Sequence, residues 1–309
     1  VDIVRTAALD NRLGSVKFTT KATGRTNGGA YATPIIGDIF VLTGLPSDGG
    51  ILRIFTDATG DGLWNTPSNW TSASGAGVPT KIDQAYVEKS ATIAGDGNTF
   101  YAKELVIEGH NTVVSPKSSA NGDNVNLVIL GNLTVTGNAN VVGVNNKSKL
   151  NLAIGDGVTP NVEAQLNVPT YTDDRGLWVN NFTVNNANAT LPEGASMQIS
   201  GDLNLIGASL FNPQGEVIFS GKNASVGNKI DVAPTSSLEF TNVRLTDYAK
   251  VYTNSNLSIA GTLIVPNGSF TANPPSTISF ANKDDGAPDA ATHFIPWNVA
   301  PEGRLIVNH

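Results

Sequence analysis

Residues 197–205 read MQISGDLNL, a pattern from which the architecture of the chain follows. Two short runs, 197–199 and 203–205, alternate apolar and polar residues, and Gly201 lies between them. Alternation with a period of two is typical of a short β-strand that buries one face. A glycine between two such strands supplies the left-handed backbone conformation that a sharp bend requires. The stretch therefore predicts a strand, a corner and a second strand.

Similar runs recur along the chain at intervals of 19 to 27 residues. They begin at Leu105, Leu127, Leu150, Leu177, Met197, Val217, Leu238, Leu257 and Ile278. Repeats of this length stack so that their apolar positions form one continuous core, with parallel strands about 4.8 Å apart. The repeat predicts an all-β chain that forms a right-handed parallel β-helix, or β-solenoid, of about nine coils over residues 101–285. An antiparallel sandwich is the alternative, because it also has turns every 8 to 12 residues or so.

Corner and core positions follow from the same alignment. A glycine or asparagine stands four residues after the start of many runs, at Gly109, Gly131, Gly201, Gly221, Asn242 and Gly261. The 34 asparagines of the chain suit such corners, because asparagine tolerates left-handed geometry and can stack into side-chain ladders. The positions expected to point inward are Leu105, Ile107, Leu127, Ile129, Leu203, Leu205, Leu238, Phe240, Leu257 and Ile259.

The two flanks do not fit the repeat. Residues 1–100 contain separate candidate strands at 16–20, 38–42 and 51–55, and they predict a β-rich cap or docking region. Residues 286–309 are expected to form a second cap or a docking strand. The longest interval contains residues 167–176, which we interpret as a loop that projects from one corner.

Composition excludes several classes of protein. The 19 Lys and Arg are outnumbered by 26 Asp and Glu, for a net charge of -7, which argues against nucleic acid as a partner. No apolar run approaches the length of about 18 residues needed for a membrane span. The chain has no cysteine, so disulfides, thiolate metal sites and thiol nucleophiles are all excluded. A secreted, processed and soluble product is expected.

Residues 55–87 carry a resemblance to a known group of proteins. They read FTDATGDGLWNTPSNW at 55–70, followed by Val-Pro-Thr at 78–80 and Asp-Gln-Ala-Tyr-Val at 83–87. The run resembles the segment that opens many repeat-rich surface proteins of Bacteroidota and related bacteria. In those proteins Gly-x-Trp-Asn, Asn-Trp, Val-Pro-Thr and Asp-x-Ala-x-Val precede a parallel β-helix. The resemblance implies an architecture and an extracellular or cell-surface location, and it implies no activity.

Trp64 and Trp70 lie within this segment and allow two interpretations. Indoles six residues apart, flanked by turn residues, commonly cover the first coil of a core and donate the ring N–H to a turn carbonyl. The alternative is a platform on which a carbohydrate stacks.

Residues 57–62 read DATGDG, which partly follows the spacing of a calcium-binding loop. The middle ligand position holds Thr59, and the twelfth position holds Ser68 where such loops have a bidentate glutamate. We therefore interpret the segment as an Asp-Gly turn, and we expect no metal or cofactor site.

Catalytic motifs are missing, and His110, His293 and His309 are far apart in the sequence. Parallel β-helices include polysaccharide lyases and hydrolases that use two or three carboxylates with a nearby cation. The local candidate for such a site is Asp173-Asp174-Arg175 in the projecting loop. Adjacent aspartates in a polar loop are usually solvated, so no enzyme activity is expected.

Three classes of function are left. The first is an extracellular structural protein that assembles head to tail into a surface filament, with residues 16–20 of one copy adding as a strand to the solenoid end of the next. The others are a surface adhesin or glycan-binding module and a polysaccharide-active enzyme of tailspike or lyase type. A fold-back of residues 1–30 as an internal cap is the alternative to assembly.

Overall fold

The structure is a computed structural model that describes residues 49–172, 175–221, 227–280 and 297–307, with the backbone alone for Phe280 and residues 297–307. Strands dominate the described part of the chain, together with one three-residue 3-10 helix, η1 (Pro67–Asn69). Within these residues no helix is long and apolar enough to cross a membrane.

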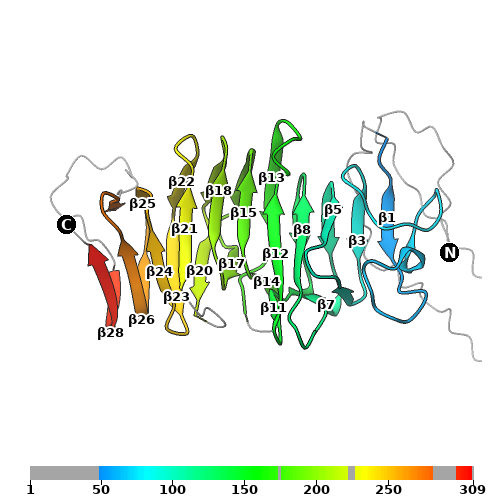
Figure 1. Ribbon diagram of the computed structural model, residues 1–309, viewed down its shortest axis with the longest axis horizontal. Coiled ribbons are helices and arrows are strands. Elements are labelled where there is room, and N and C mark those ends of the chain that lie inside the picture. Colours follow the sequence, from blue (N-terminus) through cyan, green and yellow to red (C-terminus); the bar gives the residue numbers. More distant parts are fainter. Residues whose placement is uncertain (1–48, 173–174, 222–226, 281–296, 308–309) are drawn as a thin grey trace, which may run out of the picture. The chain divides into compact units, whose positions relative to one another are not determined.

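The strands form three parallel ladders (Figure 1). Each coil adds one strand to each ladder, and the coils follow one another in chain order. The first ladder contains β1 (Leu52–Phe55), β3 (Gln84–Val87), β6 (Glu104–Ile107), β9 (Leu133–Val135), β13 (Val162–Asn167), β16 (Ala187–Leu191), β19 (Leu210–Pro213), β22 (Ser237–Phe240), β25 (Leu257–Ile259) and β27 (Ile278–Phe280).

The second and third ladders lie on the other two sides of each coil. The second contains β4 (Ala91–Ile93), β7 (His110–Pro116), β10 (Asn138–Val141), β14 (Gly176–Val179), β17 (Ser196–Ile199), β20 (Glu216–Ser220) and β23 (Asn242–Thr246). The third contains β5 (Thr99–Ala102), β8 (Asn124–Ile129), β12 (Ser148–Ile154), β15 (Phe182–Asn185), β18 (Leu203–Ile206), β21 (Asn228–Val232) and β24 (Lys250–Thr253).

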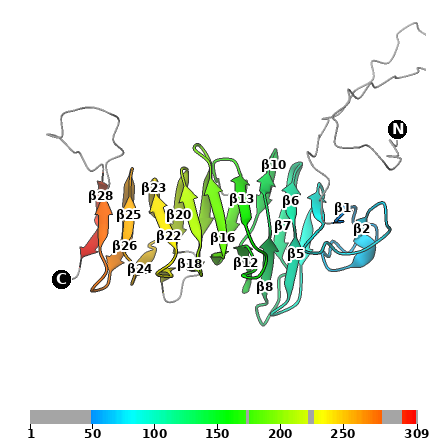
Figure 2. The same ribbon diagram turned by 90° about the horizontal axis from the view of Figure 1, so that it is seen from above.

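Two long strands complete these ladders. β26 (Leu263–Ala272) pairs with β23 through its first half and with β24 through its second half, and β28 (Trp297–Val307) pairs in parallel along β26. The view turned by 90° shows the same succession of strands (Figure 2). The chain is therefore an all-β parallel β-helix, as the repeat predicts, and the antiparallel sandwich is wrong. Among the described strands, antiparallel pairing is confined to β2 (Trp70–Thr71) with β1 and to β11 (Val144–Asn145) with β12.

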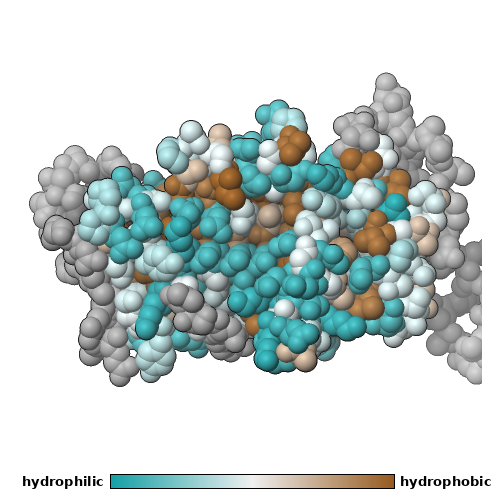
Figure 3. Space-filling model, viewed as in Figure 1, coloured by the Kyte–Doolittle hydropathy of each residue, from teal (hydrophilic) through white to brown (hydrophobic). Residues whose placement is uncertain are grey.

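All ten positions predicted to point inward are buried, with exposures between 0% and 8%. The core continues from Phe55 to Phe270 without a break between coils. Aromatic side chains from neighbouring coils meet edge to face within it, as Phe182 does with Phe211 at 5.1 Å between ring centroids. Hydrophilic residues cover much of the face seen in Figure 3, as expected when alternate residues of each strand point outward.

The apolar runs that define the sequence repeat do not all lie on one side of the coil. Those at Leu105, Leu238, Leu257 and Ile278 belong to the first ladder, those at Leu177, Met197 and Val217 to the second, and those at Leu127 and Leu150 to the third. The true offset between first-ladder neighbours varies from 19 residues (Glu239 opposite Ser258) to 33 (Leu133 opposite Leu166). The three sides share one alternating pattern, so a sequence alignment passes from one side to another without a visible break.

The ladders also begin before residue 101, at which the sequence predicts the first coil. β1 and β3 pair in parallel with one another and then with β6, so the first ladder reaches back to Leu52. From β6 to β27 it holds eight strands, where the sequence predicts about nine coils. Between the end of β13 at Asn167 and the start of β14 at Gly176, the described residues 168–172 and 175 belong to no strand. The candidate strands at 16–20 and 38–42 lie outside the described residues, as do 286–296 and 308–309. Within the predicted second cap, residues 297–307 form β28, which pairs in parallel with β26.

At most of the predicted corner positions, glycine is required for a reason other than a left-handed backbone conformation. Gly109 has a positive φ of 119°, whereas Gly131, Gly201, Gly221 and Gly261 do not lie in the left-handed region. A Cβ on Gly131 would lie 2.9 Å from the carbonyl oxygen of Lys103, one coil earlier. These glycines are therefore required by close approach between stacked corners.

The left-handed positions are taken by other glycines, such as Gly137 and Gly207, and by asparagines. Asn111, Asn146, Asn161 and Asn186 have φ between 50° and 63°. The predicted side-chain ladder is also present, because Asn151 donates to the Asn126 Oδ1 over 3.1 Å and Asn180 donates to the Asn151 Oδ1 over 2.8 Å.

Candidate functional site

Residues 56–83, here called the cap segment, cover the start of the core. Trp64 and Trp70 are 0% and 1% exposed, and their ring centroids lie 4.7 Å apart, edge to face. The Trp70 Nε1–H donates to the Trp64 carbonyl over 2.6 Å, and Phe55 packs on the Trp70 ring. The prediction that both indoles cover the first coil is confirmed. The predicted hydrogen bond from a ring N–H to a turn carbonyl forms at Trp70, whereas the buried Trp64 Nε1 has no partner among the described residues. The carbohydrate platform is wrong for these two residues, because a buried ring has no face for a sugar.

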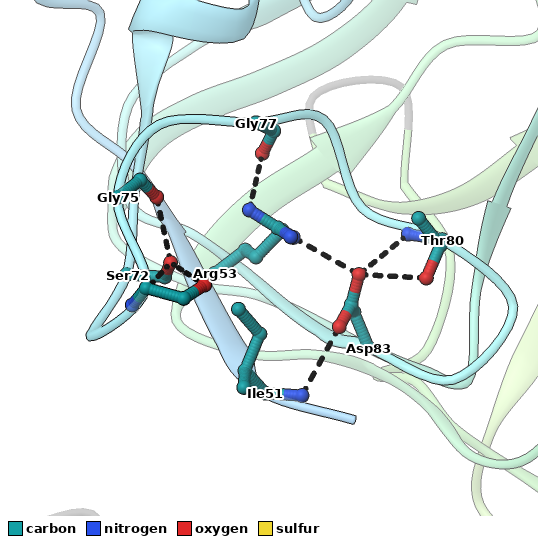
Figure 4. Close-up of polar contacts among 8 residues, drawn as sticks. Ile51, Arg53, Ser72, Gly75, Gly77, Thr80 and Asp83 are labelled. Carbon is teal, nitrogen blue, oxygen red and sulfur yellow. Dashed lines mark hydrogen bonds and ion pairs between the residues drawn. The ribbon is translucent and has the colours of Figure 1, made fainter. Parts of the chain in front are cut away.

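A buried ion pair ties the cap segment to the first strand, as Figure 4 shows. The Arg53 Nε donates to the Asp83 Oδ2 over 2.9 Å, and Arg53 Nη1 donates to the Gly77 carbonyl over 3.0 Å. Asp83 also accepts hydrogen bonds from the backbone N–H groups of Ile51 and Thr80 and from the Thr80 hydroxyl. Burial alone would raise the pKa of Asp83, but Arg53 and the hydrogen-bond donors outweigh it and lower that pKa.

These contacts explain the segment on which the resemblance rests. Thr80 and Asp83 are the polar ends of the network, and Ala85 and Val87 are the inward residues of β3. The motif therefore builds the junction between the cap segment and the first coils.

The calcium-like loop uses its carboxylates to hold its own turn. The Asp57 Oδ1 accepts the Gly62 N–H over 2.8 Å, and the Asp61 Oδ2 accepts the Thr66 hydroxyl over 2.8 Å. The hydrogen bond from the Leu63 N–H, with support from Asn69 and Thr66, lowers the pKa of Asp61 to about 2. No group of three or more His, Cys, Asp or Glu suited to a metal ion occurs among the described residues.

The structure describes only part of the catalytic candidates of the sequence. Asp173 and Asp174 lie outside the described residues, and Arg175 is exposed at the end of the β13–β14 loop. His110 is exposed at the start of β7, where its Nδ1 lies 3.1 Å from the Asn138 amide. His293 and His309 also lie outside the described part of the chain.

A groove with a volume of about 500 Å³ lies where the first ladder turns into the second over successive coils. It is lined by Thr170, Glu193, Gly194, Ala195, Ser196, Gln214, Gly215, Glu216, Thr241 and Asn242. Ser196 lies opposite Glu216, and Glu216 lies opposite Asn242, so three coils supply one row of the lining. Glu216 accepts a hydrogen bond from the Arg244 Nε over 2.9 Å.

The sequence interpretation missed this groove, although a signal for it exists. Pro192-Glu193-Gly194 and Pro213-Gln214-Gly215 are two Pro-x-Gly turns, each directly before a second-ladder strand. Leu191 lies opposite Pro213 in the first ladder, so the two turns are stacked neighbours. Their recurrence could have marked this corner as different from the others.

Comparisons with protein families, with curated proteins and with solved structures find no match to the chain. The fold and the groove therefore carry the functional argument.

Proposed function

We propose that this protein is an extracellular structural protein whose solenoid assembles head to tail into a surface filament. Two properties of the described residues support a mechanical role. The core is continuous over the described coils, and polar side chains of successive coils bind one another, as Asn126, Asn151 and the buried Asn180 do. The extracellular location is supported by the resemblance of residues 55–87 to the opening segment of bacterial surface proteins.

The difference between the two ends of the first ladder carries the proposal. At its start, β2 pairs antiparallel with β1 and the two indoles cover the core. At its other end, β27 pairs with β25 alone among the described strands. At the same end of the second and third ladders, β28 pairs with β26 alone among the described strands. An unpaired strand edge is a template on which a strand of another chain can add.

The added strand would come from residues 1–30 of the next copy, in which Val16-Lys17-Phe18-Thr19-Thr20 has the alternation of an edge strand. Such a contact joins different surfaces of the two copies, so it repeats without closing and produces a filament. The proposal gives these residues the role of donor and gives β27 and β28 the role of acceptor.

The test compares the full chain with a variant that lacks residues 1–30, by sedimentation velocity and negative-stain microscopy. We expect filaments from the full chain and folded monomers from the variant. A synthetic peptide of residues 1–30, added at low molar ratio to the full chain, should shorten the filaments because it occupies the acceptor edge. A scrambled peptide is the control.

Two results would contradict the proposal. Filaments that persist after the deletion would show that residues 1–30 are not the donor. Unfolding or aggregation of the variant would show that these residues form an internal cap of the same chain.

A further inference from the structure

The groove contains two kinds of polar side chain. Some hold the stack together: the Asn242 Oδ1 accepts the Thr262 N–H over 3.0 Å, and the Ser196 Oγ accepts the Tyr171 N–H over 2.6 Å. At corners elsewhere, Asn132, Asn181 and Asn256 each accept, through Oδ1, the backbone N–H of a residue one coil later, at 2.8 to 3.0 Å. In the groove, Glu193, Gln214 and Thr241 have no side-chain hydrogen bond to any described residue. Part of the lining therefore stabilises the stack, as at other corners, and Glu193, Gln214 and Thr241 are left without a side-chain partner among the described residues.

The shape of the groove also suits a ligand. Its volume of about 500 Å³ lies within the range of roughly 300–1,000 Å³ typical of small-molecule sites. Glu193, Gln214 and Thr241 follow β16, β19 and β22, so they come from three successive coils whose stacked strands lie about 4.8 Å apart. That spacing is close to the length of one pyranose unit, so successive coils can contact successive sugars of a chain.

The chemistry of the lining indicates which ligand fits. Carboxylate, amide and hydroxyl groups together offer both donors and acceptors, as the vicinal hydroxyls of a sugar require. Arg244 pairs with the Glu216 carboxylate, whereas Glu193 is exposed and has no cation bound among the described residues. The excess negative charge of the lining, on a chain of net charge -7, disfavours acidic polymers.

We propose that this groove binds a neutral oligosaccharide, with Glu193, Gln214 and Thr241 as its hydrogen-bonding contacts. The site is independent of filament assembly, because it lies on the side of the coils and uses neither β27 nor β28. None of its ten lining residues is aromatic, so stacking does not add to the affinity. The affinity is therefore low, with a dissociation constant on the order of 1 mM.

The test uses the full chain and four neutral hexasaccharides as probes: cello-, malto-, manno- and xylohexaose. Binding is measured by ligand-observed NMR, and hexagalacturonic acid serves as the acidic probe. The double variant Glu193→Ala/Gln214→Ala removes two contacts. The matched control is Glu239→Ala/Gln165→Ala, which removes the same residue types from exposed positions of the first ladder.

We expect at least one neutral hexasaccharide to bind, with affinity reduced about tenfold or more in the groove variant and changed less than about twofold in the control. Glu193→Gln should keep the neutral sugar and raise the weak affinity for the acidic probe. The inference is overturned if no neutral probe binds, if the two double variants behave alike, or if the acidic probe binds best. Sedimentation of the same samples reports assembly separately, so failure of this site and failure of the filament are distinguishable.

Discussion

Asp83 and Glu193 are both carboxylates next to a proline-containing turn, and they differ in what surrounds them. Asp83 is 3% exposed and is held by Arg53, Thr80 and the Ile51 N–H. Glu193 is exposed and has no side-chain partner among the described residues. A carboxylate whose acceptor sites are filled from within the chain stabilises the fold, and one left open to solvent is available to a ligand. Stability and binding should therefore respond to mutations in opposite regions.

The largest effect should come from the cap segment. Trp70→Ala removes a buried indole from its contacts with Phe55 and Trp64 and leaves a cavity at the end of the core. We expect the free energy of unfolding to fall by about 4 kcal/mol, measured by urea denaturation. Val158→Ala, at a residue 83% exposed, is the control and should change it by less than about 0.5 kcal/mol. A cap segment that unfolds without affecting the coils would contradict this expectation.

Asp83→Ala should have the next largest effect, about 3 kcal/mol, because it leaves the Arg53 guanidinium buried without its partner. The double variant Asp83→Ala/Arg53→Met removes the orphaned charge and should recover part of that loss. Thermal unfolding followed by circular dichroism measures both variants. If the double variant is less stable than Asp83→Ala, the ion pair is not the cause.

Acid should act on the same carboxylate with a smaller effect. The pKa of Asp83 is lowered in the folded chain, so its contribution to stability is complete above the unfolded pKa of about 3.9 and is lost as the pH falls through the folded pKa. The melting temperature of the wild type should therefore decrease more steeply below about pH 4 than that of Asp83→Asn. The loss is smaller than in Asp83→Ala, because a protonated carboxyl still occupies the site. Parallel curves for the two proteins would exclude Asp83 as the titrating group.

The smallest effect on stability should come from the groove. Glu193→Ala/Gln214→Ala removes side chains that have no hydrogen bond to any described residue, so the free energy of unfolding should change by less than about 0.5 kcal/mol. A loss above 1 kcal/mol or so would show that these residues hold the turns together, and the contrast with Asp83 would disappear.

The recurrence of alternating runs such as 197–205 at intervals of 19 to 27 residues was enough to predict the class of fold, since it specifies which side chains enter the core. The role of Trp64 and Trp70 could also be predicted, because turn residues flank them in the sequence. The need for glycine at Gly131 and Gly261 could not be predicted from the sequence, because the atoms that would clash with a Cβ there belong to the preceding coil. Predicting the groove would also have required the strand register, because the turns at Glu193 and Gln214 are neighbours only when Leu191 lies opposite Pro213.

The shared pattern of the three ladders has a consequence for the order of folding. A segment such as 197–205 carries little local information about which side of a coil it belongs to, so an isolated piece of the chain can close in more than one register. The cap segment has no such ambiguity, because its paired indoles and its Arg53–Asp83 contact occur once. A coil that forms against an existing coil inherits the register of that coil. We therefore expect the cap to act as the template from which coils are added in sequence, much as the chain is synthesised.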